Sequence, residues 1–284
     1  MSICPICSTN LSLKFQLSTK IYHCSSCDLY VAPEVSFDKS FVSGYNQEKA
    51  ALALKGLRIN NFREIIKYLK GELKPNSNGI EIGCSYGWFL DICKENNIAC
   101  IGMEPETSLA NQAKQSGHKV ITGFFPEDLS SDQKDFDFII FNDVFEHIPN
   151  IGNIVYSCHK LLAPGGVLII NLPLSTGFFY RTAKFLYRLG RKQPLERMWQ
   201  LQFHSPHFNY FNKSNLTQLV ESRGFKLSGF QHLTTITKDS IKSRIEMDKK
   251  QTFASKMTVA LLKIIYPLIN KLPKDIGCFY FKKP

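Results

Sequence analysis

The stretch from Gly79 to Leu90, GIEIGCSYGWFL, decides the fold. A short apolar segment is followed by two glycines, Gly83 and Gly87, and then by the apolar start of a helix. In doubly wound α/β proteins, ligands bind at the carboxyl ends of the strands, where glycine lets the backbone approach a ligand closely. This strand, turn and helix therefore predict a site for a nucleoside cofactor.

The spacing of the glycines indicates which kind of cofactor binds. The dinucleotide pattern G-x-G-x-x-G is absent, since glycines stand at positions 83 and 87 but not at 85 or 88. The carboxylate of Glu81 would repel a pyrophosphate and attract a positively charged group. We therefore expect a cofactor that carries a sulfonium and an α-ammonium group.

A second acidic residue follows the next predicted strand. That strand ends in Gly102-Met103-Glu104-Pro105, and Glu104 stands twenty-three residues after Glu81. An acid at the tip of the second strand is placed to accept hydrogen bonds from the ribose hydroxyls. Glu104 and the adjoining Pro105 are therefore predicted cofactor-binding residues.

Short apolar runs alternate with helical stretches through the middle of the chain, which predicts βαβ units and a mainly parallel sheet. A helical pattern over residues 37–74 precedes them, and another helix is expected from Ser214 to Ser222. The predicted strands are Gly79–Ile82, Ala99–Met103, Lys119–Thr122, Phe136–Phe141 and Val167–Asn171.

Composition bounds the class of protein. The chain has 284 residues, of which 44% are hydrophobic and 21% are charged, as in ordinary globular proteins. Its formal net charge of +11 favours anionic partners. The first nine residues lack the apolar core of a secretory signal, so we expect a cytoplasmic protein.

Four of the nine cysteines form two C-x2-C pairs near the N-terminus. The pairs, Cys4 with Cys7 and Cys24 with Cys27, are separated by sixteen residues, as in four-thiolate zinc sites. Four protein ligands leave no open position for water, so the predicted zinc is structural. We expect residues 1–35 to form a zinc ribbon that this metal holds together.

Several stretches together resemble class I S-adenosylmethionine-dependent methyltransferases, over about residues 78–230. The stretches are Glu81-Ile-Gly83-x-x-x-Gly87, Glu104, FIIFNDVFEHI from Phe138 to Ile148, and Leu161-Leu-x-Pro164-Gly165-Gly166.

The resemblance implies a Rossmann-like, seven-stranded, mainly parallel sheet whose last strand, Cys278–Phe281, is reversed. It also implies that Gly83 and Gly87 line the methionine part of the cofactor, with Asn142 and Asp143 beside it. Such enzymes often have an acid near the third strand for the adenine, where this chain has Gly123-Phe124-Phe125-Pro126. Stacking of Phe124 or Phe125 on the adenine is the expected substitute, and Asp128 is the other candidate.

Methyl transfer needs alignment of the acceptor and exclusion of water, and a hydroxyl acceptor also benefits from a general base. His147 follows the fourth strand, and His204 and His207 lie in a later segment, so these three are the candidate catalytic residues. Support of the cofactor loop is the alternative role for His147. Glu146-His147 is also similar to the Glu-His pair of quinone and phenol O-methyltransferases, some of which use a divalent ion.

The organisation expected from these features is a zinc ribbon (1–35), a helical linker (36–75) and a methyltransferase domain (76–284) with an acceptor-side cap (176–212). The ribbon followed by Asp28–Pro33 is similar to the head of methyltransferases that act on sugars and surface glycans. We therefore expect O- or C-methylation of a small-molecule or carrier-linked acceptor, such as a nucleotide sugar.

Two other acceptor classes stay open, quinones or phenols and ribosomal RNA. The residues Asn142-Asp143-Val144-Phe145 disfavour RNA, because base-amine methylases have two prolines and an aromatic residue after the Asn or Asp. The segment from Phe253 to Leu272 is too often interrupted by lysine and proline to span a membrane. We expect a packed helix there, with a helix on a membrane surface as the alternative.

Overall fold

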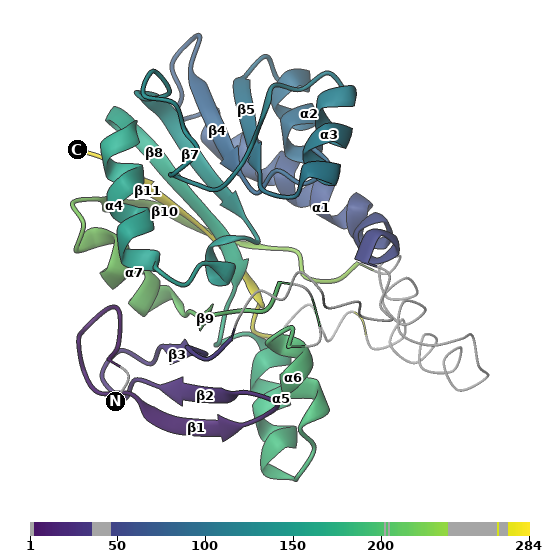
Figure 1. Cartoon of the computed structure of the whole chain (residues 1–284), viewed down its shortest axis with the longest axis vertical. Coiled ribbons are helices and arrows are strands. Elements are labelled where there is room, and N and C mark those ends of the chain that lie inside the picture. The colour runs from purple at the N-terminus through teal and green to yellow at the C-terminus, as the bar shows by residue number, and fades with distance from the viewer. Residues whose placement is uncertain (1–2, 36–46, 202, 204, 238–265, 267–271) are drawn as a thin grey trace.

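The structure is a computed structural model, and it describes residues 3–35, 47–201, 203, 205–237, 266 and 272–284 (Figure 1). A seven-stranded sheet has the order β10-β11-β8-β7-β4-β5-β6. Its strands are β4 (Asn78–Ile82), β5 (Ala99–Glu104), β6 (Val120–Thr122), β7 (Phe136–Asn142), β8 (Leu162–Pro173), β10 (Lys226–Leu233) and β11 (Ile276–Lys282). Strands β4 to β8 pair in parallel, whereas β11 is antiparallel to both of its neighbours. The predicted parallel sheet with a reversed last strand is confirmed.

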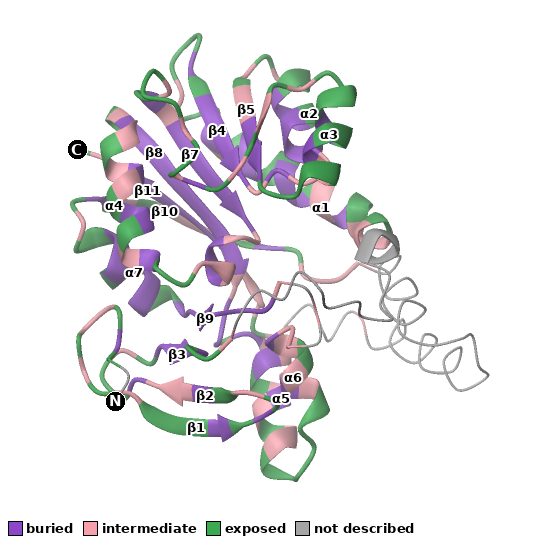
Figure 2. Ribbon diagram, in the orientation of Figure 1, coloured by how far each residue is buried: buried purple, intermediate pink, exposed green. Residues whose placement is uncertain are grey.

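Helices cover both faces of this sheet because the central strands are apolar on both sides. Along β7, Phe138 and Ile140 pack with the helices α1 (Gln47–Leu69) and α2 (Trp88–Glu95). Ile139 and Phe141 face the opposite layer, which contains α4 (Ile151–Leu161) and α7 (Lys213–Glu221). These side chains are fully buried, and Figure 2 shows the strands as the buried centre of the domain. Helix α3 (Thr107–Gln115) connects β5 to β6, and the short helix η1 (Phe145–His147) follows β7.

A smaller sheet lies beside the N-terminal cysteines. Its first three strands are β1 (Ser12–Gln16), β2 (Lys20–His23) and β3 (Tyr30–Val31). The fourth strand, β9 (Asn209–Tyr210), pairs with β3 although it is distant in sequence. Helices α5 (Phe178–Arg188) and α6 (Gln193–Met198) pack on this sheet in a separate core that includes Trp199. The predicted ribbon and the predicted cap thus share one sheet and one core.

Some predicted elements differ from the observed ones. The helical pattern over residues 37–74 corresponds to α1, although residues 36–46 lie outside the described part of the chain. The helix predicted for 253–272 also falls outside it, apart from Tyr266 and Leu272. Strand β10 was not among the strands predicted from the residues. Within the described ranges, no helix is long and apolar enough to cross a bilayer.

Candidate functional site

The turn between β4 and α2 requires its glycines. Gly83 and Gly87 have φ values of 71° and 77°, a region that residues with a side chain rarely adopt. A Cβ atom on Gly83 would lie 2.6 Å from the side chain of Val144. The amide of Gly83 donates to the carbonyl of Met103 over 2.8 Å, which fastens the turn to the end of β5. The turn therefore lies close to Val144 and is hydrogen-bonded to the end of β5.

Glu81 is a buried acid at the end of β4. It is 2% exposed, and its Oε1 accepts a hydrogen bond of 2.8 Å from the amide of Asn142. Among the described residues, its Oε2 has no hydrogen-bond partner. Burial raises the pKa of Glu81 to about 8, against the opposing effect of the Asn142 hydrogen bond. A buried oxygen without a partner beside the glycine turn is suited to a cationic ligand.

Glu104 ends β5 and organises the backbone around it. Its Oε2 accepts from the amide of Ser85 over 2.8 Å, and its Oε1 accepts from the amide of Glu106 over 3.0 Å. Burial raises its pKa, although both backbone hydrogen bonds lower it. Each carboxylate oxygen keeps a further lone pair that a hydroxyl donor can use. The following residue, Pro105, is exposed at the same edge of the sheet.

The end of β6 carries the two aromatic residues predicted to meet the adenine. Phe125 is buried and packs edge-on against Phe141, with 5.8 Å between the ring centroids. Phe124 is 57% exposed, and its amide donates to Asp128 over 2.7 Å. Phe125 therefore packs in the core, whereas Phe124 and Asp128 are exposed, and stacking of either phenylalanine on the adenine stays a prediction.

Asn142 and Asp143 lie where β7 ends. Asn142 bridges two strands, because its amide donates to Glu81 and its carbonyl accepts from Asn171 over 3.4 Å. The backbone of Asp143 has a φ of 53°, and its carboxylate lies 3.8 Å from the guanidinium of Arg58. Arg58 comes from α1, and its charge partly offsets the effect of burial, which raises the pKa values of Glu81 and Glu146. Sequence reasoning missed Arg58, since a single basic residue in a helix carries no signal.

Three titratable side chains meet just beyond this point. Glu146 and His147 belong to η1, and His207 comes from the segment before β9. The Oε1 of Glu146 lies 4.0 Å from Nε2 of His147 and 4.0 Å from Nε2 of His207. Their ligand-type atoms all lie within 4.8 Å of one another. The structure thus brings together two of the three predicted histidines, while His204 lies outside the described residues.

Burial disfavours the charged forms of all three side chains. It raises the pKa of Glu146 well above its usual range, and it lowers that of His147 to about 4 and that of His207 well below its usual range. His147 Nδ1 lies 3.0 Å from the carbonyl oxygen of Pro206, so it must donate, which leaves Nε2 with a free lone pair. Within the described chain, Glu146 Oε2 and both ring nitrogens of His207 have no hydrogen-bond partner. Nε2 of His147 can therefore accept a hydrogen bond from a bound group.

The N-terminal sheet holds the His207 segment in place. The amide of Phe208 donates to the carbonyl of Glu146 over 2.9 Å, and the carbonyl of Phe208 accepts from Ala32 over 2.8 Å. Asn209 donates from its side chain to the carbonyl of Ile148 over 3.0 Å. The segment therefore links η1, which follows β7 of the large sheet, to β3 of the small sheet.

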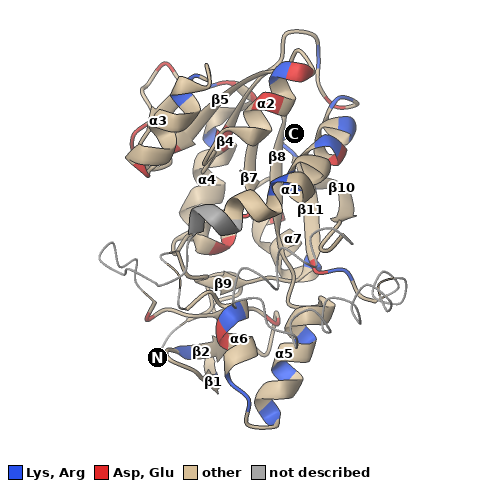
Figure 3. Ribbon diagram, turned by 90° about the vertical axis from the view of Figure 1, so that its right-hand side faces the viewer, with Lys and Arg blue, Asp and Glu red and all other residues tan. Residues whose placement is uncertain are grey.

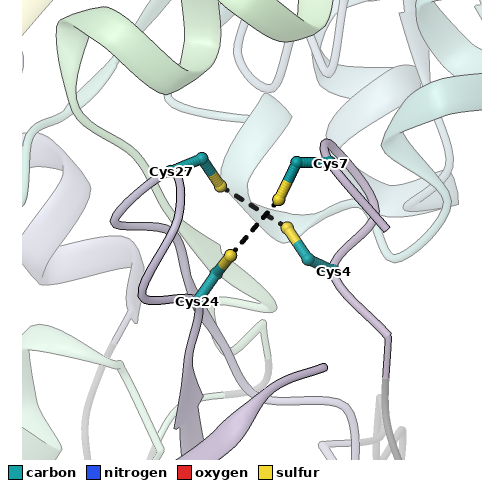
Figure 4. Close-up of side chains that lie close together, drawn as sticks. All are labelled: Cys4, Cys7, Cys24 and Cys27. Atoms are coloured by element: carbon teal, nitrogen blue, oxygen red, sulfur yellow. Dashed lines mark hydrogen bonds between the residues drawn. The ribbon is translucent and has the colours of Figure 1, made fainter. Parts of the chain in front are cut away.

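The four N-terminal cysteines converge, as Figure 4 shows. Cys4 Sγ lies 3.5 Å from Cys27 Sγ, and Cys7 Sγ lies 3.3 Å from Cys24 Sγ. All four sulfur atoms lie within 4.8 Å of one another. Four thiolates around a tetrahedral ion with Zn–S bonds of about 2.3 Å would have a similar spacing, so the donor set fits zinc.

Comparisons with known proteins agree on the large domain. A family model described as a methyltransferase domain matches residues 55–228, more than half of the chain. The C-methyltransferase NovU of Streptomyces niveus is 24% identical over 152 residues, which are 52% of this chain and 32% of that protein. A ubiquinone biosynthesis O-methyltransferase of Coxiella burnetii is 22% identical over 168 residues, 57% of this chain and 69% of that one. The match thus spans only about a third of the length of NovU.

Solved structures share the fold at low sequence identity. A methyltransferase of Archaeoglobus fulgidus that depends on S-adenosylmethionine has a TM-score of 0.55 and 16% identity, covering 82% of this chain and 98% of that one. A phosphoethanolamine N-methyltransferase 2 of Haemonchus contortus, solved with S-adenosylhomocysteine, has a TM-score of 0.58 and 17% identity, covering 88% and 60%.

Proposed function

The chain belongs to the methyltransferase domain family and is a methyltransferase, and on this premise we propose that it methylates a small-molecule or carrier-linked acceptor. S-adenosylmethionine supplies a methyl group that its sulfonium activates for in-line displacement. The remaining work falls to the protein, which must bind the cofactor, align the acceptor, exclude water and receive a proton where the acceptor loses one.

The residues around the β4–α2 turn fit this cofactor. Glu81 offers a buried oxygen without a partner for a cationic group, and Gly83 has no side chain where the ligand would pass. Glu104 offers acceptors for ribose hydroxyls, and Pro105, Gly87, Asn142 and Asp143 belong to the same edge of the sheet. On the adenine side we propose Phe124.

The observation that carries the proposed chemistry is the buried cluster of Glu146, His147 and His207. We propose that Nε2 of His147 takes the proton of an acceptor hydroxyl as the new O–C bond forms and the S–C bond breaks. Hydrogen bonding of Nδ1 to Pro206 orients the ring for this step. A low pKa keeps the imidazole unprotonated in the free enzyme. Glu146 and His207 shield the site from water and flank the base.

The acceptor is proposed from the family context and from the buried position of the cluster. A sugar or surface-glycan precursor is the first candidate, because the N-terminal ribbon is similar to the head of methyltransferases that act on such acceptors. The similarity to NovU, a C-methyltransferase, supports methylation at carbon. A quinone or phenol is the second candidate, supported by the similarity to a ubiquinone biosynthesis O-methyltransferase. Ribosomal RNA is the third candidate and has no support from the relatives named above.

We also propose that Cys4, Cys7, Cys24 and Cys27 hold one structural zinc ion. The convergence of their sulfur atoms supports this assignment. Metal analysis of protein purified without chelators should find one zinc per chain. A zinc content near zero would remove the proposal without affecting the assignment of the cofactor turn.

A transfer assay tests the function. The enzyme is incubated with methyl-labelled S-adenosylmethionine and, in separate reactions, with nucleotide sugars, quinone precursors and unmodified ribosomal RNA. We expect label in a small acceptor, and label in RNA alone would contradict the proposal. With the accepted substrate, His147→Gln should lower kcat by about 10²-fold or more while leaving cofactor affinity unchanged. The exposed His232→Gln serves as the matched control and should retain full activity.

A further inference from the structure

Helix α5 presents apolar side chains to solvent. Phe185 is 57% exposed and Leu189 is 63% exposed, and the two stand one helical turn apart. An amphipathic helix that only covers a core would bury such residues, as α5 does with Tyr180 and Ala183 on its other face. The outward face of α5 therefore has two apolar side chains at positions that are usually polar on a solvent-exposed helix face.

Cations surround these two side chains. Residues 178–192 contain five basic residues and no acidic one. Arg181 and Arg188 lie three or four residues from Phe185 and are exposed. Figure 3 shows α5 with blue bands and no red one. Lys184 points inward instead, since its Nζ lies 3.1 Å from the hydroxyl of Tyr30.

Three described acidic side chains near α5 have partners, and one of them, Asp275, accepts a hydrogen bond of 2.7 Å from the amide of Phe179 at the start of α5. Glu196 of α6 accepts a hydrogen bond of 3.1 Å from the amide of Ser18, and Glu34 pairs with Lys20 over 3.3 Å. Among the described residues, positive charge therefore predominates on the outward face of α5, which favours an anionic partner.

We propose that the outward face of α5, formed by Arg181, Phe185, Arg188 and Leu189, docks on an anionic phospholipid bilayer. Phe185 and Leu189 would enter the boundary between headgroups and acyl chains, and the flanking cations would meet the lipid phosphates. Complementary charge favours this partner, and the aliphatic Leu189 beside Phe185 suits acyl chains rather than the stacking of nucleic-acid bases. The inference concerns where the enzyme works, and its test requires no methyl transfer.

Flotation with vesicles tests the proposal on the full chain. Vesicles of phosphatidylcholine alone are compared with vesicles containing a third of phosphatidylglycerol. We expect binding to the anionic vesicles that weakens as salt rises. Phe185→Gln and Leu189→Gln should each weaken binding about tenfold. Arg181→Gln and Arg188→Gln should each weaken it about fivefold.

Helix α4 offers a matched control. Tyr156 is 54% exposed, with Lys160 Nζ 4.5 Å from its ring centroid, so α4 also presents an aromatic residue beside a cation. The double variant Tyr156→Gln, Lys160→Gln should bind vesicles like the native chain. Unchanged thermal unfolding and cofactor binding of the α5 variants would show that their folds are intact.

Two results would overturn the proposal. One is equal binding of the α5 variants and the native chain. The other is binding of the native chain to an RNA of mixed sequence, but not to anionic vesicles, with the α5 variants impaired on that RNA.

Discussion

Replacing Glu81 with glutamine separates the charge of this side chain from its shape. In the native chain, Oε1 of Glu81 accepts a hydrogen bond from Asn142, and the amide oxygen of glutamine can accept the same bond. Only the ability to become an anion is lost. The variant therefore tests whether the turn recognises a cationic cofactor through a carboxylate.

The size of the effect follows from the pKa of Glu81, which burial raises to about 8. At pH 7 about nine tenths of the free enzyme then carries a neutral carboxyl group. A bound cation favours the charged form, so binding should release about 0.9 proton at pH 7. Affinity should accordingly rise about tenfold between pH 6 and pH 7.

Calorimetric titration with S-adenosylmethionine measures this proton release directly. The apparent binding enthalpy at pH 7 should differ between two buffers of different ionisation enthalpy. Glu81→Gln should remove both this difference and the pH dependence, whereas Glu72→Gln, at a residue that pairs with Lys282 over 3.2 Å, should preserve them. Identical enthalpies in the two buffers for the native chain would refute the reasoning.

The same substitution should change stability in the opposite direction. A folded-state pKa raised from 4.5 to about 8 gives a contribution that is full below pH 4.5 and is lost as pH rises towards 8. At pH 7 the contribution of Glu81 to the free energy of unfolding is about 3 kcal/mol smaller than it is below pH 4.5. Glu81→Gln should therefore unfold at higher temperature than the native chain when no cofactor is bound.

Three further predictions concern separate parts of the site. Glu104→Ala should weaken cofactor binding by about 1–3 kcal/mol because ribose hydroxyls would lose their acceptors, and unchanged affinity in calorimetry would exclude that role. His147 has a folded-state pKa of about 4 instead of 6.5, so its contribution to stability is present above pH 6.5 and is lost as pH falls towards 4. Urea unfolding should show about 2 kcal/mol of this loss by pH 5, and His147→Gln should reduce the decline. Gly83→Ala should destabilise the fold by about 1–3 kcal/mol, since a Cβ would lie 2.6 Å from Val144. Gly56→Ala, at a position on α1 where a Cβ would meet no other atom, should instead stabilise the fold by up to about 1 kcal/mol. Equal melting temperatures of the two variants would contradict this contrast.

Local patterns were sufficient to predict most of the large domain. Short apolar runs between helical stretches predicted the bounds of β4 to β7 to within one residue at each end. Such runs are a clear signal because buried parallel strands are apolar on both faces. Strand β8 begins at Leu162, five residues before the predicted start, since Pro164, Gly165 and Gly166 do not resemble a strand. The reversal of β11 came from the family resemblance, as no local pattern encodes strand direction.

Contacts between distant segments could not be predicted in the same way. Strand β9 has only two residues, and its pairing with β3 depends on how the whole chain folds. The meeting of His207 with Glu146 depends on the same pairing. Phe125 looked equivalent to Phe124 in the sequence, and only packing against Phe141 distinguishes the two.

A crystal structure of the chain with S-adenosylhomocysteine would show whether the β4–α2 turn binds the cofactor beside His147. We expect the ligand at the β4–α2 turn, with its ammonium group near Oε2 of Glu81. Its ribose hydroxyls should contact Glu104, and its sulfur should face the side of η1 that carries His147. A ligand bound at another edge of the sheet, or a sulfur atom turned away from η1, would contradict this expectation.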